Sequence, residues 1–172
     1  LIGKNVTPFV WNNLSNNIDL GYLLANAGFP IVLCDVSNLY FDMAYNKDPR
    51  EQGLYWGGFV DTRKVWEFIP ENLYRSSKRS SLGKPFNPSS DFKEAIRLNK
   101  EGLANILGIQ GHLWSESLNG EDQMLEYYYL PRLIGLSERA WAAHPKWAMV
   151  EDPLIREEQE NTAWNSFVYK LA

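Results

Sequence analysis

The stretch that decides the fold reads GIQGHLWSE, from Gly108 to Glu116. Its apolar residues predict a buried strand, and side chains alternate along a strand, so Trp114 and Glu116 are expected on the same side. An indole covers the C–H face of a sugar ring, while a carboxylate accepts hydrogen bonds from sugar hydroxyl groups. The segment from Tyr40 to Asp42 repeats this pairing of an aromatic residue with an acid two positions later. Each pair alone is also typical of a core aromatic beside a solvated acid, but two such pairs favour a binding site.

The composition excludes several classes of function. The 172 residues carry a formal net charge of −4, which provides no basic surface for nucleic acid. No apolar run is long enough to span a membrane. The one cysteine, Cys34, excludes an internal disulfide and is expected to be a small buried residue. No spacing of His, Cys, Asp and Glu indicates a metal site, and no Gly-rich loop indicates a phosphate-bearing cofactor.

Aromatic residues are the most unusual part of the composition. Seven Trp and nine Tyr are present. Such polar-tipped aromatic side chains favour a carbohydrate or peptide surface, although an aromatic-rich core would use them as well.

Three short apolar runs predict strands, at residues 6–11, 31–34 and 106–114. Helical patterns lie between them, and this alternation favours parallel βα units. Ligands bind at the carboxyl ends of the strands in parallel α/β folds and in (β/α)8 barrels, which is where the candidate site residues fall. Three strands cannot close a barrel, and the edges of so small a sheet would be open. The predicted fold class is therefore α/β, and we expect the chain to be part of a larger domain.

Helices are expected before and after the second strand in the sequence. The first covers residues 18–27, because Gly28 supplies a stop. Residues 92–103 form another candidate helix. The buried stripe of the first helix is predicted to hold Leu20, Leu23, Leu24 and Ala27.

Helices are also expected after the third strand. Pro131 should kink or restart the chain, which predicts one helix over residues 124–129 and another over residues 133–143. Asp152 is a good N-cap and Pro153 suits the first helical position, so a last helix is predicted to begin there.

The segment after the second strand has no sustained period but is rich in aromatic residues, Tyr55 and Trp56 among them. A long loop of this kind is usually functional or packed over a site. We therefore expect residues 42–90 to be a long active-site loop insertion. It would lie within a single partial domain that spans residues 1–172.

Six segments of the chain carry a resemblance to a known family through their sequence, order and spacing. They are FVWN (9–12), NLYFD (38–42), GLYWG (53–57), ILGIQGHLWSE (106–116), YLPRL (129–133) and SERAW (137–141). In this order and spacing they resemble the catalytic domain of glycoside hydrolase family 20, the β-N-acetylhexosaminidases and chitobiases. The GLYWG loop is more similar to the bacterial chitobiases than to the animal hexosaminidases. The resemblance covers about residues 6–147 and implies that the chain is the C-terminal part, about three βα units, of a (β/α)8 TIM barrel.

The resemblance implies a substrate-assisted retaining mechanism, in which the acetamido oxygen of the substrate attacks C1. Tyr40 matches the tyrosine whose hydroxyl holds that oxygen in the geometry for attack, which makes Tyr40 the catalytic candidate. Trp11 and Trp114 match the tryptophans that wall the pocket of the acetamido methyl group.

The remaining candidates would bind the sugar. Asp42 and Glu116 match acids that accept hydrogen bonds from hydroxyl groups of the terminal sugar, and Trp56 resembles the platform on which the next sugar stacks. Two carboxylates at neighbouring strand ends are also the acid and base of an ordinary glycosidase, in which their separation decides the stereochemical outcome. This alternative stays open on the sequence.

The chain departs from the family pattern in two respects. The family's catalytic pair is an Asp-Glu dipeptide on an earlier strand, and this sequence contains no Asp-Glu dipeptide. The sugar-binding arginine of an early strand is also absent. We expect both to lie outside the chain, in the remaining N-terminal part of the barrel, so the chain alone should be inactive. The alternative is a non-catalytic carbohydrate-binding or split-subunit fragment.

The resemblance also implies the ligand and the surroundings. The substrate would be a terminal, non-reducing, β-linked N-acetylhexosamine, in chitobiose-like oligosaccharides that contain N-acetylglucosamine. No cofactor and no metal are implied. Chitin degradation would place the protein outside the cytoplasm, as an extracellular, periplasmic or cell-envelope protein.

Three further residues are interpreted as structural. His112 is expected to share the face of Trp114 and to be a hydrogen-bonded core histidine rather than a group at the site. Arg132 and Arg139 are expected to form ion pairs or to pack a helix.

Overall fold

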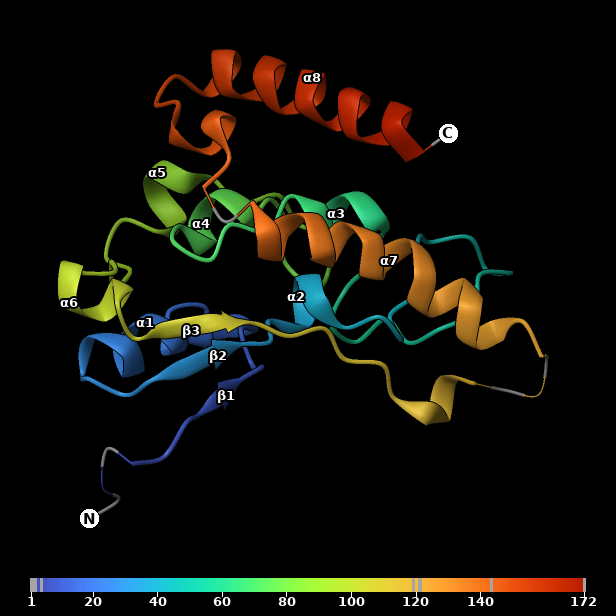
Figure 1. Cartoon of the computed structure of the whole chain (residues 1–172), viewed down its shortest axis with the longest axis horizontal. Coiled ribbons are helices and arrows are strands. Elements are labelled where there is room, and N and C mark those ends of the chain that lie inside the picture. The colour runs from blue at the N-terminus through green and yellow to red at the C-terminus, as the bar shows by residue number, and fades with distance from the viewer. Residues whose placement is uncertain (1–2, 4, 119, 121, 143, 172) are drawn as a thin grey trace.

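The computed structural model describes residues 3, 5–118, 120, 122–142 and 144–171. In this part of the chain, three parallel strands form one sheet in the order β1-β2-β3. Helix α1 packs against β2, helices α3 and α7 pack against each other, and α8 lies outermost, beyond them (Figure 1). The strands are β1 (Phe9–Val10), β2 (Ile31–Leu33) and β3 (Ile106–Ile109); the α-helices are α1 (Leu20–Asn26), α2 (Val36–Leu39), α3 (Thr62–Trp66), α4 (Leu73–Ser76), α5 (Pro88–Asp91), α6 (Lys100–Leu103), α7 (Met124–Trp141) and α8 (Pro153–Leu171); and the 3₁₀ helices are η1 (Ser15–Asn17), η2 (Ser115–Ser117) and η3 (Lys146–Met149).

All three strands lie where the sequence predicts them, but each is shorter than predicted. Val10 pairs with Leu33, and Leu33 pairs with Ile109. Val10 and Leu33 are buried in the main core. The other face carries Phe9 opposite Val32, and Phe9 is exposed. The sheet therefore has one face covered by helices and one open face.

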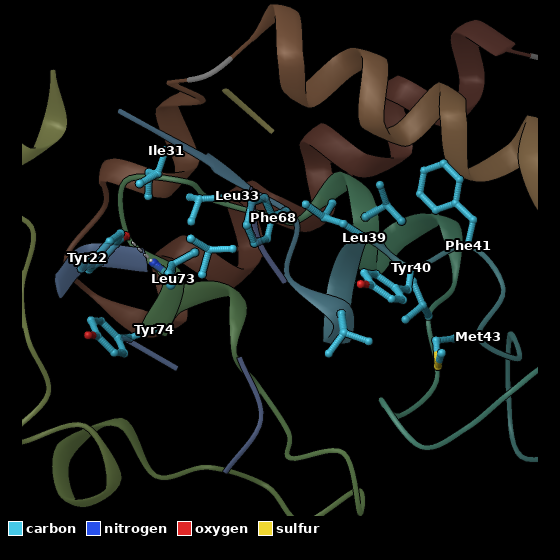
Figure 2. Packing of buried hydrophobic residues seen from close by; sticks show 14 of the residues in the cluster. Tyr22, Ile31, Leu33, Leu39, Tyr40, Phe41, Met43, Phe68, Leu73 and Tyr74 are labelled. Atoms are coloured by element: carbon cyan, nitrogen blue, oxygen red, sulfur yellow. Dashed lines mark hydrogen bonds between the residues drawn. The ribbon is translucent and has the colours of Figure 1, made fainter. Parts of the chain in front are cut away.

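A short helix interrupts the second strand and thereby places the site. After β2 the chain forms α2 and then pairs again with the continuation of β3, through a parallel bridge between Tyr40 and His112. The His112 N–H donates to the Leu39 carbonyl (2.8 Å), and the Phe41 N–H donates to the His112 carbonyl (2.6 Å). Phe41 packs on Tyr129 of α7, whereas Tyr40 points away from that helix (Figure 2).

Helix α1 forms as predicted, and Leu20 and Leu24 of its predicted buried stripe pack against the main core. Leu23 does not, because it is 50% exposed. A Cβ atom at position 21 would lie 2.7 Å from Leu33 Cδ2. Glycine at this position therefore lets the helix approach the sheet closely. This approach turns Leu23 outward, and the buried face is made by Gly21, Tyr22 and Ala25.

The long segment after β2 contains the short helices α3, α4 and α5. Asp61 caps α3 by accepting a hydrogen bond from the Lys64 N–H (2.7 Å), a local signal within a region expected to be a loop. The Tyr22 hydroxyl donates to the Pro70 carbonyl (2.8 Å) and accepts from the Leu73 N–H (2.9 Å). Tyr22 thus holds the start of α4 against α1 (Figure 2).

The predicted helix over residues 92–103 is wrong, because only its last turn, α6, is helical. Phe92 packs on Tyr74, with ring centroids 5.1 Å apart. The Ile96 N–H donates to the carboxylate of Asp19 (3.0 Å). These tertiary contacts hold the backbone in a non-helical path.

Pro131 lies inside α7, a single continuous helix, so the predicted restart of the helix after Pro131 is wrong. A proline cannot donate to the carbonyl four residues earlier, which here is that of Tyr127. The Tyr45 hydroxyl donates to this carbonyl instead (2.8 Å). A long-range hydrogen bond thus replaces the missing helical one. The helix ends at Trp141, and the predicted end at residue 143 lies outside the described residues.

Helix α8 begins as predicted. The Asp152 carboxylate accepts hydrogen bonds from the Leu154 N–H (2.9 Å) and the Ile155 N–H (3.1 Å), and Pro153 is the first helical residue. Among the described residues, no helix is both long and apolar enough to cross a membrane. One face of α8 packs on a second core cluster, which includes Trp66, Trp147, Trp164 and Phe167.

Candidate functional site

The candidate residues come from the carboxyl ends of all three strands. Trp11 follows β1, and Trp114 follows β3. Tyr40 and Asp42 follow β2 and α2. Because the carboxyl ends of parallel strands meet at one edge of a sheet, these side chains converge. Trp56 reaches the same edge from the loop that follows Asp42.

Tyr40 stands at the centre of an aromatic cluster. The centroid of its ring lies 6.5 Å from that of Trp11, 6.0 Å from that of Trp56 and 6.4 Å from that of Trp114. Trp11 and Trp56 also meet edge to face, with centroids 6.3 Å apart. The structure therefore brings together four of the residues that the sequence singles out.

The cluster combines a buried phenol with open indole faces. Tyr40 is buried, whereas Trp11, Trp56 and Trp114 are each nearly half exposed (45%, 46% and 48%). Burial raises the pKa of the Tyr40 phenol, and the neighbouring Asp42 acts in the same direction. Tyr40 therefore stays protonated at neutral pH and can donate a hydrogen bond. The exposed indoles offer apolar surface to a ligand.

His112 stacks on Tyr40, with ring centroids 5.0 Å apart and planes inclined by 6°. It also lies 5.9 Å from Trp114, which confirms that the two share a face. Burial lowers the pKa of His112, so its imidazole is neutral at physiological pH. Its buried Nε2 has no hydrogen-bond partner in the described part of the chain. The expectation of a fully hydrogen-bonded core histidine is therefore wrong.

Asp42 is a buried carboxylate with unused acceptors. It is 1% exposed, and neither of its carboxylate oxygens has a hydrogen-bond partner among the residues that the structure describes. Burial raises the pKa of Asp42 to about 6; the charge of Glu116 adds to this, and the charge of Arg132 opposes it. Unsatisfied carboxylate oxygens suit the hydroxyl donors of a ligand.

Glu116 lies on the exposed side of the site. The prediction places Glu116 on the side of Trp114 because side chains alternate along a strand. This reasoning is wrong, because η2 begins at Ser115 and ends the extended backbone. Glu116 is exposed, but it lies within electrostatic range of Asp42, whose pKa its charge raises.

Trp56 is held over the cluster by a loop with its own internal hydrogen bonds, residues 43–60, which we name the Trp56 loop. The Ala44 N–H donates to the Leu54 carbonyl (2.7 Å), and residues 43 and 54 form a parallel bridge. Gly53 has a φ of +118°, and a Cβ atom there would lie 2.8 Å from the Ala44 nitrogen. This turn therefore requires glycine, and it directs the Trp56 loop towards the aromatic cluster.

The two structural arginines are buried on α7. Within the described ranges, Arg132 and Arg139 donate to backbone carbonyls and form no ion pair. Their helix-packing role is confirmed, and the ion pairs are not. Cys34 is fully buried as predicted, and burial raises the pKa of its thiol to about 12. Over the same described residues, no group of three His, Cys, Asp or Glu side chains could hold a metal ion.

Comparison with known proteins adds an independent observation. Residues 1–144 match the family model for the catalytic domain of glycosyl hydrolase family 20. The chain is 34% identical over 145 residues to a beta-hexosaminidase of Vibrio vulnificus, a match that covers 82% of this chain and 16% of the relative. It is 29% identical over 123 residues to the N,N'-diacetylchitobiase of Vibrio harveyi, which covers 70% of this chain and 13% of that protein.

A solved structure shares the fold. It is the GH20 exo beta-N-acetylglucosaminidase of Vibrio harveyi in complex with N-acetylglucosamine, with a TM-score of 0.57 and 22% sequence identity. The match covers 95% of this chain and 21% of that one. The chain is thus a small α/β piece of a TIM-barrel family fold, and it spans about 16% of the length of the Vibrio vulnificus relative.

Proposed function

The chain belongs to glycosyl hydrolase family 20, and we propose that it is the C-terminal part of the catalytic barrel of a chitobiase-like β-N-acetylhexosaminidase. The observation that carries this proposal is the Tyr40 phenol, enclosed by Trp11, Trp56 and Trp114 at the carboxyl edge of the sheet. A donor between apolar walls suits an acetamido group, whose oxygen accepts a hydrogen bond while its methyl group needs a dry surface.

Tyr40 would act in the chemical step. In substrate-assisted retention the acetamido oxygen attacks C1 of the same sugar, and the leaving group departs with a proton from a general acid. A phenol that donates to this oxygen fixes it in line with C1, which lowers the entropic cost of attack. Because burial raises the pKa of Tyr40, this donor is present over the whole neutral range.

Asp42 and Glu116 would select the terminal sugar. The two unpartnered oxygens of Asp42 can accept hydrogen bonds from two hydroxyl groups or from one hydroxyl group and water. A sugar that lacked these hydroxyl groups would leave a buried carboxylate unpaired, which is the kind of penalty that gives strong discrimination. Trp56 would stack on the next sugar of a chitobiose-like substrate.

The acid–base pair would lie outside this chain, in the remaining N-terminal part of the barrel. The open face of the sheet, with Phe9 exposed beside Val32, supports a partner of this kind. On this proposal residues 1–172 alone do not turn over substrate. A role in degrading chitin-derived polymers would place the whole protein outside the cytoplasm, at the cell envelope, in the periplasm or secreted.

A second candidate is a fragment that binds sugars without chemistry, alone or as a split subunit. It is favoured by one observation, the absence of an Asp-Glu dipeptide in the sequence. The three half-exposed tryptophans would serve such a binding role equally well.

One experiment separates the two candidates. The full-length protein that contains this chain is incubated with chitobiose, and the release of N-acetylglucosamine is followed by NMR, which also reports the anomer formed first. The first candidate predicts turnover with the β-anomer as the initial product. Saturable binding of N-acetylglucosamine without turnover would favour the second candidate, and neither binding nor turnover would contradict both.

A further inference from the structure

Arg132 is the most deeply buried charge on α7, with no exposed surface. It forms no ion pair with any carboxylate in the part of the chain that the structure describes. A buried guanidinium without a counter-ion is costly unless hydrogen bonds compensate it. Its three nitrogens donate to the carbonyls of Val60 (2.8 Å), Tyr128 (3.0 Å) and Met43 (2.6 Å).

Two of these carbonyls are the two ends of the Trp56 loop, residues 43–60. Met43 follows Asp42 directly, and Val60 closes the loop by donating its own N–H to the Ala44 carbonyl (3.0 Å). The guanidinium of Arg132 therefore joins the start and the end of the loop to α7. The loop lies beside the start of this helix (Figure 1).

Tyr45 completes the arrangement. The centre of its ring lies 3.5 Å from Arg132 Cζ, so the ring faces the guanidinium in a cation–π contact. Its hydroxyl donates to the Tyr127 carbonyl, the group that Pro131 leaves without a helical partner. The loop and the helix are thus joined by the Tyr45 hydrogen bond, by the two Arg132 hydrogen bonds to Met43 and Val60, and by the ring contact. The third Arg132 bond, to Tyr128, stays within α7.

We propose that Arg132 is a positioning residue for sugar recognition, which holds the backbone next to Asp42 and the loop that carries Trp56 in their binding geometry. This inference rests on the proposed function, because Asp42 and Trp56 bind sugar only under it. The Arg132 charge also favours the ionised form of Asp42, although the two side chains share no hydrogen bond among the described residues. Lysine keeps that charge but cannot donate to three carbonyls from one planar group.

Arg139 supplies a matched control on the same helix. It is also buried, and it also donates to backbone carbonyls, those of Trp66 (3.1 Å) and Ala142 (2.8 Å). Its guanidinium lies 5.6 Å from the ring centroids of Trp66 and Trp147, in the second core cluster. Arg139 therefore has the chemistry of Arg132 without its contact to the Trp56 loop.

The test compares Arg132→Lys with Arg139→Lys in the full-length protein. For Arg132→Lys we expect KM for chitobiose to rise on the order of 10-fold, with a smaller change in kcat. Arg132→Met, which also removes the charge, should in addition move the acidic limb of the kcat/KM profile to higher pH. Arg139→Lys should lower the thermal midpoint without changing KM or the pH profile.

The outcomes are distinguishable from those of the proposed function. A wild-type protein that releases no N-acetylglucosamine speaks against the proposed function itself. An active wild type in which the Arg132 and Arg139 variants share the same KM and pH profile overturns this inference alone. If Arg132→Lys does not fold, Tyr45→Phe is the second variant. It removes the hydroxyl that donates to the Tyr127 carbonyl and keeps the ring over Arg132, and it should raise KM in the same direction; an unchanged KM would overturn the inference.

Discussion

The imidazole of His112 lies flat against the phenol of Tyr40, with ring centroids 5.0 Å apart and planes inclined by 6°. Such pairs contribute roughly 0.5–1.5 kcal/mol beyond the area they bury, so His112 fixes the plane of the Tyr40 ring. We expect His112→Ala to lower kcat on the order of 10-fold, because the phenol loses this support. His112→Phe keeps the stack and should retain most of the activity. Steady-state kinetics of the full-length protein measure both variants. Equal kcat values for the alanine variant and wild type would contradict a role of His112 in supporting Tyr40.

The buried carboxylate of Asp42 is predicted to lower the free energy of unfolding at neutral pH. Because burial raises its pKa to about 6, the folded protein holds a proton that the unfolded chain, with an Asp pKa of about 3.9, releases. The stability that this proton contributes is present below about pH 4 and is lost as the pH rises through about 6. Asp42→Asn should therefore stabilise the protein at pH 7, relative to pH 4, by about 1–2 kcal/mol after allowance for solvent screening.

Urea unfolding of wild type and Asp42→Asn at the two pH values measures this difference. Glu116→Gln removes an exposed charge that adds to the raised pKa of Asp42, so it should reduce the pH dependence of stability, but by less than Asp42→Asn does. Asp42→Asn should also raise KM, because the amide nitrogen cannot accept a hydrogen bond. A variant that is neither more stable at pH 7 nor weaker in binding contradicts the assignment of Asp42.

Trp56 is predicted to act on the second sugar only. Its ring is 46% exposed and packs edge to face on Trp11 and Tyr40, so Trp56→Ala should cost about 0.5–3 kcal/mol of unfolding free energy and leave the protein folded. Loss of one stacking face should raise KM for chitobiose by roughly 3- to 10-fold. An aryl glycoside has a leaving group that can stack on Trp56, whereas an alkyl glycoside has one that cannot. Comparing KM for the two substrates separates stacking from general binding. Tyr55→Ala removes a neighbouring, more exposed ring and serves as the control; an equal effect of both variants would contradict a specific stacking role.

Trp147 is predicted to matter for stability and not for the site. It is buried and stacks on Trp66, with centroids 5.3 Å apart, in the cluster that holds α8. Trp147→Ala should cost about 3–5 kcal/mol of unfolding free energy. Trp141, which is 91% exposed, gives a control whose alanine variant should stay within about 0.5 kcal/mol of wild type. Thermal unfolding checks both, and a changed KM in a folded Trp147 variant would show that the two cores are not independent.

The sequence predicts which residues the strand ends bring together better than it predicts the helices. Tyr40, Trp11 and Trp114 are recognisable because each follows a short apolar run, and parallel strands bring their ends together. The same local reasoning fails for Glu116, since the sequence pattern does not predict that the backbone turns at Ser115. Strand alternation holds only as far as the strand continues.

Long-range contacts decide the features that local patterns miss. Pro131 does not divide α7 because a hydroxyl from Tyr45, far away in the sequence, satisfies the freed carbonyl of Tyr127. Leu23 faces outward because Gly21 meets Leu33 of the sheet. The role of Arg132 also depends on carbonyls from distant loop ends, which no spacing of residues in the sequence indicates.

The most direct test of the central claim compares Tyr40→Phe with wild type in the full-length protein, with chitobiose as substrate. The change removes one hydroxyl and keeps the ring contacts with Trp11, Trp56 and Trp114. If the phenol holds the attacking acetamido oxygen, kcat should fall by about 100-fold or more, while KM changes little. An unchanged kcat would contradict the account, because Tyr40 would then have no part in the chemical step.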